Sequence, residues 1–204
     1  MTHDPTKHHR RSIRLPAYDY AQAGAYFVTM VAHRRECLFA EMVDGRVVVS
    51  ACGEIVEHEW LRSTEIRPGV RLDAFVVMPN HIHGIVIICG QPIVGAHSCA
   101  PLHDAPVGRS PRSLGSFIAG LKSAATKRIN EIRGTPGLPV WQRNYYEHVI
   151  RNEEELDAIR QYIADNPLRW AEDRENPHNV GAGPRACPDR APLQHSDGWT
   201  CPTP

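Results

Sequence analysis

The stretch RLDAFVVMPNHIHGIVIIC, residues 71–89, contains two apolar runs on either side of Pro79-Asn80. Each run has the length of a strand and is rich in β-branched residues, and the dipeptide between them is typical of a turn. The sequence therefore predicts an antiparallel pair of strands, over 71–78 and 81–89, buried at the centre of a sheet.

His81 and His83 lie one residue apart on the second of these strands. The two-residue period of a strand puts both imidazoles on the same face, where they can share one metal ion. An isolated His-x-His also has a plainer interpretation, in which two histidines near a turn bond to backbone or water.

Strand and helix patterns alternate in the rest of the chain. We expect further strands over 25–33 and 140–150, and a hairpin over 39–49 that turns at Asp44-Gly45. Apolar residues at helical spacing predict helices over 55–66, 113–132 and 153–166. Asn152 is a suitable N-cap for the last helix, and Pro167 closes its far end.

The chain has 204 residues, of which 42% are apolar and 23% charged, a composition that favours one globular core over wholesale disorder. We divide it into a basic N-terminal arm (1–15), one folded domain (16–175) with a mobile loop over 90–112, and a disordered tail (176–204). The sequence has neither a signal-peptide pattern nor an apolar run of about 18 residues, so we expect a cytoplasmic protein without a membrane partner.

Net charge is zero, but the basic residues are clustered. One cluster is in the N-terminal arm, and another follows the polar side of the predicted helix over 113–132. The candidate phosphate contacts are Arg10, Arg11, Arg14, Lys122, Lys127 and Arg128. Phosphate binding explains this distribution, and so does a solvated helix face with a flexible tail.

Tyr162 and Asn166 are four residues apart on a predicted helix, so their Cβ atoms are about 5–6 Å apart. A phenol and an amide oxygen would then face the same point. Each residue alone has an ordinary explanation, as a core aromatic or as a helix-terminal residue before proline. Tyr146 shares one face of a predicted strand with His148 and is a second candidate nucleophile.

Three strings in this order, VVMPNHIHGIV (76–86), WQRNYYEHVIRNEEEL (141–156) and RQYIADNP (160–167), resemble the REP-associated tyrosine transposases, a branch of the single-tyrosine HUH transposases of the insertion-sequence type. The resemblance covers about four fifths of the chain. It implies an α+β fold, the ferredoxin-like sandwich of HUH endonucleases, with helices packed on a central antiparallel sheet. It also implies that His81 and His83 bind a metal ion, that Tyr162 is the nucleophile, and that Asn166 is a third metal ligand.

The chemistry explains why these groups belong together. A phenolate that attacks a DNA phosphodiester forms a 5′-phosphotyrosine link and a free 3′-hydroxyl, so rejoining needs no ATP. Because an ordinary phenol has a pKa of about 10, it needs activation, which a divalent ion can supply by polarising the phosphate. Imidazole and amide ligands are compatible with manganese, and the resemblance implies Mg²⁺ or Mn²⁺.

The expected function is sequence- or hairpin-specific cutting and joining of single-stranded DNA during transposition, by a nucleoid-associated monomer or homodimer. Two alternatives remain open. One is a domesticated protein that binds DNA hairpins without cutting them, and the other is a metal-dependent hydrolase built on His81 and His83.

Overall fold

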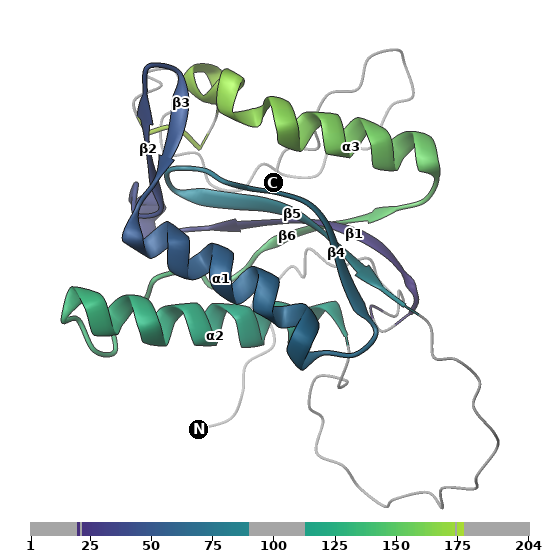
Figure 1. Ribbon diagram of the computed structural model, residues 1–204, viewed down its shortest axis with the longest axis horizontal. Coiled ribbons are helices and arrows are strands. Elements are labelled where there is room, and N and C mark those ends of the chain that lie inside the picture. The colour runs from purple at the N-terminus through teal and green to yellow at the C-terminus, as the bar shows by residue number, and fades with distance from the viewer. Residues whose placement is uncertain (1–19, 21, 90–112, 174, 178–204) are drawn as a thin grey trace, which may run out of the picture.

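The computed structural model describes residues 20, 22–89, 113–173 and 175–177 (Figure 1). The expected basic arm over 1–15 and the expected loop over 90–112 lie outside these residues. The expected tail lies outside them from residue 178 onward. Among the described helices, none combines the length and the hydropathy that crossing a bilayer requires.

Four strands form one antiparallel sheet in the order β4-β5-β1-β6. Their bounds are β1 Gly24–Val31, β4 Val70–Val77, β5 His81–Ile88 and β6 Tyr146–Ile150. One helix connects β1 to β4 and another connects β5 to β6, which gives the β-α-β-β-α-β order of the ferredoxin-like fold. The predicted fold is therefore confirmed, with the β4–β5 pair and β1 supplying the three strands around the histidines.

The helices cover both faces of the sheet (Figure 1). Helices α1 (Ala51–Ile66) and α2 (Leu114–Arg133) lie side by side on one face, and α3 (Glu153–Asp165) lies on the other. Each helix begins at a side chain that accepts a hydrogen bond from a backbone N–H of the first turn, which satisfies a group that the helix leaves unpaired. These N-caps are Ser50, Ser113 and Asn152.

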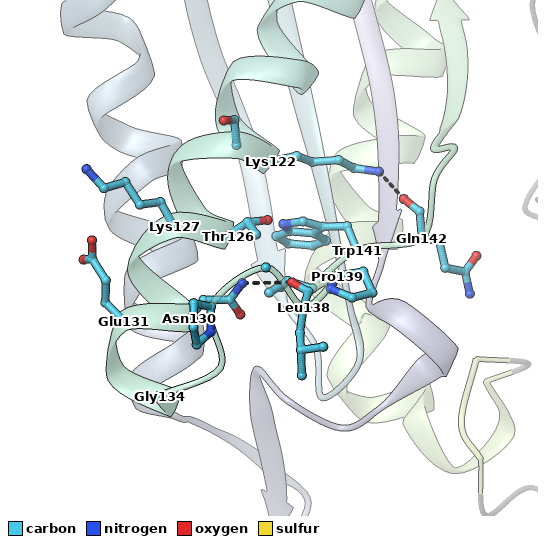
Figure 2. Close-up of a pocket in the computed structure, with 14 residues that line it drawn as sticks. Lys122, Thr126, Lys127, Asn130, Glu131, Gly134, Leu138, Pro139, Trp141 and Gln142 are labelled. Carbon is cyan, nitrogen blue, oxygen red and sulfur yellow. Dashed lines mark hydrogen bonds between the residues drawn. The ribbon is translucent and has the colours of Figure 1, made fainter.

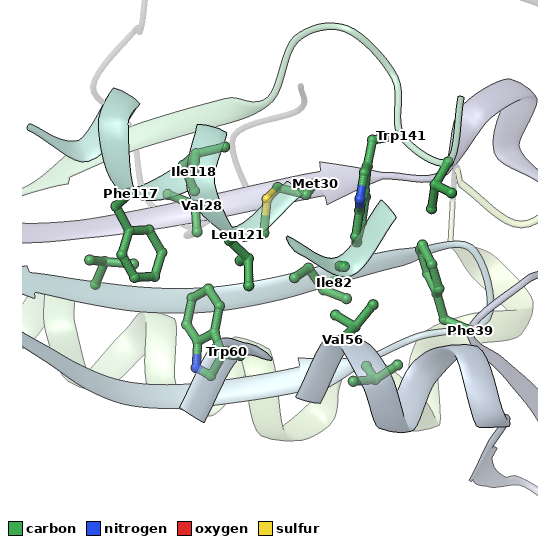
Figure 3. Close-up of a cluster of buried hydrophobic side chains, with 14 of the residues drawn as sticks. Val28, Met30, Phe39, Val56, Trp60, Ile82, Phe117, Ile118, Leu121 and Trp141 are labelled. Carbon is green, nitrogen blue, oxygen red and sulfur yellow. The ribbon is translucent and has the colours of Figure 1, made fainter. Parts of the chain in front are cut away.

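Two apolar clusters separate the three layers. The larger lies between the sheet and α1 and α2, where Trp60, Phe117 and Ile82 are fully buried (Figure 3). The smaller lies under α3 and includes Phe27 and Ile85. Because side chains alternate along a strand, the odd-numbered positions 81, 83 and 85 of β5 share the α3 face. The two imidazoles are thus placed on the side of the sheet that carries α3.

The predicted hairpin is present as β2 (Ala40–Val43) and β3 (Arg46–Val49), with Asp44 (φ 49°) and Gly45 (φ 72°) both left-handed at the turn. The strand predicted over 140–150 is shorter than expected, because β6 begins only at Tyr146. Among the described residues before β6, only an isolated bridge between Ala32 and Trp141 continues the pairing with β1, and the ammonium group of Lys122 donates to the carbonyl oxygens of Gln142 and Asn144.

The chain also does not leave the fold at Pro167. It tightens into the 3₁₀ helix η2 (Asn166–Glu172), which accepts a proline near its start. This helix carries the chain back across the face that holds the histidines, where Trp170 lies against His81 with ring centroids 5.9 Å apart.

Candidate active site

The two imidazoles lie on the central strand β5 and are almost completely buried, with 0% of His81 and 5% of His83 exposed. Their Nε2 atoms are 3.1 Å apart. The Nδ1 atom of His81 contacts Asn80 Oδ1 at 2.9 Å, and the Nδ1 atom of His83 contacts Thr29 Oγ1 at 2.8 Å. Both Nδ1 atoms are therefore engaged with the protein, and both Nε2 atoms face the same point.

Burial keeps both imidazoles neutral. It lowers the pKa of His81 to about 4, although the Asp173 carboxylate and the Asn166 side chain oppose this effect. Burial, and then the neighbouring His81, lower the pKa of His83 well below its ordinary range. Neutral imidazole is the form that binds metal ions, so the pair is in the correct state at neutral pH.

Tyr162 meets this pair from α3. Its Oη atom is 3.3 Å from His83 Nε2, and the two rings are edge to face with centroids 5.3 Å apart. Phe27 packs against both rings, stacked on His83 and edge-on to Tyr162. The phenol and the imidazoles that the sequence analysis singled out therefore converge within one chain.

Two contacts set the position of α3. Its apolar face, with Ile159 and Ile163, packs into the smaller cluster. On its other side, the Arg160 guanidinium donates two hydrogen bonds to the Asp73 carboxylate of β4, at 2.7 and 2.9 Å. A bidentate pair of this kind fixes direction as well as distance. The helix is thus held to β4 by a residue that precedes Tyr162 by two positions, about half a helical turn.

Asn166 ends α3 and is 2% exposed. Its Oδ1 atom is buried and accepts no hydrogen bond, although the side chain is close enough to His81 to raise the pKa of that imidazole. An unpaired buried amide oxygen costs free energy of about 1–3 kcal/mol unless a ligand satisfies it. Asn166 thus brings a buried amide oxygen without a hydrogen-bond partner to the neighbourhood of His81.

Asp173, just beyond η2, is a site residue that the sequence analysis missed. Its Oδ2 atom is 4.0 Å from His81 Nε2. One ligand atom from each of His81, His83 and Asp173 lies within 4.8 Å of the others, and this is the one such group found among the described residues. No pattern in the sequence marks this acid, because its position depends on the turn of η2 rather than on a strand or helix period.

The alternative nucleophile, Tyr146, is on the same face of the sheet but on the edge strand β6. Its ring packs edge-on against Phe27, with centroids 6.2 Å apart. Its neighbour His148 is 2.6 Å from the Glu155 carboxylate, through Nε2, and so links β6 to the start of α3. The strand register places Thr29 of β1 between Tyr146 and His83, whereas the Tyr162 Oη atom contacts His83 Nε2 directly.

The predicted phosphate contacts on α2 lie on the opposite face of the sheet from the imidazoles (Figure 1). Arg128 is paired with the buried Glu59 carboxylate at 2.6 Å, and burial lowers the pKa of Lys122 to about 8. Lys127 is exposed. The other predicted contacts, Arg10, Arg11 and Arg14, lie outside the described residues.

A pocket of about 830 Å³ is present on this opposite face, between α2 and the segment 134–142 (Figure 2). Two of its polar side chains, Lys122 and Asn130, bond to backbone carbonyl groups of the fold. Figure 2 shows Lys122 bonded to the Gln142 carbonyl and Asn130 bonded to the Leu138 carbonyl. The pocket contains none of the histidines, and we do not assign chemistry to it.

No family model matches the sequence. An uncharacterized protein of Haemophilus influenzae (strain ATCC 51907 / DSM 11121 / KW20 / Rd) is 37% identical over 174 residues, which are 82% of this chain and 93% of that protein.

Among solved structures, the fold is similar to that of a REP-associated tyrosine transposase bound to a REP hairpin, with a TM-score of 0.49, 20% identity, and coverage of 76% of this chain and 73% of that chain. It is also similar to a putative transposase from Deinococcus radiodurans R1, with a TM-score of 0.37, 18% identity, and coverage of 74% and 95%. On the strength of the extended sequence identity, the chain belongs to the same family as the Haemophilus influenzae protein.

Proposed function

We propose that the protein cuts and joins single-stranded DNA through a covalent bond to Tyr162, with the help of a divalent cation. One observation carries the proposal: the Tyr162 Oη atom lies 3.3 Å from His83 Nε2, which is itself 3.1 Å from His81 Nε2. A nucleophile and a pair of metal-binding nitrogens thus face one point from two different elements, α3 and β5.

The residues around this point fit a divalent cation. His81 and His83 would provide two neutral nitrogens, Asn166 an amide oxygen that has no other partner, and Asp173 a carboxylate. Two nitrogen and two oxygen ligands suit Mn²⁺, and a carboxylate and an amide also suit Mg²⁺. When bound, the cation would polarise the scissile phosphate and balance the charge that develops on it.

The chain's own part in the reaction is to hold the phenol. Tyr162 Oη attacks the phosphorus atom and loses its proton to solvent, the bond from phosphorus to the 3′-oxygen breaks, and that oxygen takes up a proton. The product is a 5′-phosphotyrosine and a free 3′-hydroxyl. Attack by a 3′-hydroxyl on the same phosphorus reverses the step and joins two strands.

We propose hairpin-forming single-stranded DNA as the substrate, on the basis of the sequence resemblance. The backbone contacts of this DNA are assigned first to the basic arm with Arg10, Arg11 and Arg14. The cations of α2 are second candidates, because they lie across the sheet from Tyr162 and a strand would have to pass round the β6 edge to reach them. Phosphate contacts of either kind make affinity fall as salt rises.

The test is to trap the covalent adduct. The protein is incubated with labelled oligonucleotides taken from palindromic sequences around its own gene, with Mn²⁺ or Mg²⁺, and separated on a denaturing gel. We expect an adduct with the wild type and with Tyr146→Phe, and none with Tyr162→Phe or without the cation. Equal adduct from the wild type and Tyr162→Phe would overturn the assignment of the nucleophile.

The same experiment separates the alternatives. A wild-type protein that binds the hairpin but forms no adduct with either cation is a binding protein. A wild-type protein that releases cut DNA with no covalent intermediate is a hydrolase. His81→Ala, with retained hairpin binding and no adduct, would support the role of the cation in the chemical step.

A further inference from the structure

We infer that Asn80 is a positioning residue that holds His81 in a single tautomer, and that Thr29 allows His83 to exchange tautomers when a divalent cation binds. The inference rests on the cation site of the proposed function. It concerns the hydrogen atoms of the site, which decide whether the two Nε2 atoms present lone pairs or N–H groups to a ligand.

The orientation of the Asn80 amide is settled by its own hydrogen bonds. Asn80 is completely buried, and its Nδ2 group donates to the carbonyl oxygens of Arg35 and Glu175. Its Oδ1 atom therefore faces His81 Nδ1, at 2.9 Å. Because an amide oxygen only accepts, His81 Nδ1 must carry the proton, and His81 Nε2 presents a lone pair.

The partner of His83 imposes no such choice. Thr29 Oγ1 is 2.8 Å from His83 Nδ1, and a hydroxyl group can either donate or accept. In the structure the Nε2 atoms of His81 and His83 are in hydrogen-bonding contact at 3.1 Å. Since His81 Nε2 has no proton, this contact assigns the His83 proton to Nε2. Thr29 then donates to His83 Nδ1, and Tyr162 Oη, 3.3 Å from the same Nε2, does not donate to it.

Cation binding requires the opposite arrangement at His83. Its Nε2 atom must present a lone pair, so the ring proton moves to Nδ1, and Thr29 Oγ1 accepts instead of donating. The net number of protons on the imidazole does not change: Nε2 releases its proton to solvent as the cation binds, Nδ1 takes up a proton from solvent, and the Thr29 hydroxyl rotates so that its oxygen accepts. His81 keeps its Nδ1 proton in both states, because Asn80 permits no other arrangement.

Asn80 also links the tautomer of His81 to the segment that carries Asp173. Its two backbone acceptors belong to Arg35, which has the left-handed φ of 59°, and to Glu175, which follows Asp173 by two residues. The side chains of Arg35 and Glu175 form an ion pair at 3.1 Å. Asn80 thus joins three segments at the point where the imidazoles and the carboxylate meet.

Three variants separate these roles. Asn80→Asp keeps the acceptor for His81 and loses the donors to Arg35 and Glu175. Asn80→Leu has a side chain of similar size and loses both the acceptor for His81 and the donors to Arg35 and Glu175. Thr29→Val is the matched control on the other imidazole, because it removes only the hydroxyl beside His83.

The measurement is nitrogen NMR of protein labelled with ¹⁵N-histidine, first without a cation and then during a titration with Mg²⁺. The signals of the two residues are assigned with His81→Gln and His83→Gln. In the wild type we expect protonated Nδ1 at His81 in both states, and a change from protonated Nε2 to protonated Nδ1 at His83. Thr29→Val should alter the His83 signals and leave the His81 tautomer unchanged.

Mn²⁺ affinity, measured by electron paramagnetic resonance, gives a second readout. Loss of the partner that orients a metal-binding imidazole lowers affinity by about 10- to 100-fold, and we expect this for Asn80→Leu. Asn80→Asp should retain the His81 tautomer and bind Mn²⁺ at least as tightly as the wild type. Thermal melts of each variant show whether it is folded.

The inference is overturned if His81 carries its proton on Nε2 in the wild type, or if folded Asn80→Leu binds Mn²⁺ as tightly as the wild type. An unchanged His83 tautomer on cation binding overturns the part played by Thr29. If the wild type binds no cation, the metal-dependent part of the proposed function is wrong. The tautomer of His81 in cation-free protein still tests the role of Asn80.

Discussion

Gly84 follows His83 on β5, and the indole of Trp60 packs directly against its backbone. A Cβ atom at this position would lie 2.5 Å from two carbon atoms of the Trp60 ring and 3.3 Å from Phe75. Trp60 is fully buried and stacked on Phe75, with centroids 4.7 Å apart, so the ring has no space into which it can move. We therefore expect Gly84→Ala to push β5 away from α1.

The cost follows from the size of this overlap. Overpacking of a rigid core by one carbon destabilises a protein by about 1–3 kcal/mol. For a domain of this size, 2 kcal/mol corresponds to a fall in Tm of roughly 4–8 °C. The displacement of β5 also moves His83, so we expect weaker Mn²⁺ binding in the folded variant. Urea denaturation and calorimetric melts give the stability, and titration with Mn²⁺ gives the affinity.

Gly24→Ala is the matched control, because a Cβ atom there would meet Tyr26 at 3.6–3.7 Å, an ordinary contact. It lies on the neighbouring strand β1 and should change Tm very little. If Gly84→Ala is as stable as Gly24→Ala, the packing of Trp60 against β5 is looser than the geometry requires, and the expected displacement of β5 is wrong.

Three further predictions concern the elements that surround the imidazoles. The hydrogen bonds from Arg160 lower the pKa of Asp73, so this pair stabilises the fold above the unfolded pKa of about 3.9 and loses its effect as pH falls through the lower folded value. Arg160→Gln should therefore destabilise the protein more at pH 7 than at pH 3 in urea denaturation, and an equal loss at both would contradict this. Asn166→Leu removes a buried unpaired oxygen, so cation-free protein should be at least as stable in thermal melts, while calorimetry should show weaker Mn²⁺ binding. Asp173→Asn should lower Mn²⁺ affinity about tenfold, as expected for loss of a charged ligand, whereas the neighbouring exposed acid changed by Glu172→Gln should not.

Much of the fold could be predicted from the sequence because local patterns and tertiary packing agree. The two apolar runs around Pro79-Asn80 form β4 and β5, and the helical spacing after Ser113 gives α2. The pair His81 and His83 shares one face because of the strand period alone. Asn152 caps α3 as its position before three acids predicts.

The remaining features depend on contacts between distant segments. The late start of β6 coincides with the bonds that Lys122 makes with the carbonyl groups before it, and no property of residues 140–145 indicates them. The amphipathic pattern of α2 predicted its basic side but not which face of the sheet the helix covers. Asp173 reaches His81 only because η2 turns the chain after Pro167.

The most direct test of the account is to locate the DNA on the protein by mass spectrometry. The wild type is allowed to react with single-stranded hairpin DNA in the presence of Mn²⁺, digested with nuclease and protease, and the peptide that carries the nucleotide remnant is sequenced. We predict the remnant on the Tyr162 side chain, the phenol that lies 3.3 Å from His83 Nε2. A remnant on Tyr145 or Tyr146, with residue 162 unmodified, would contradict the account.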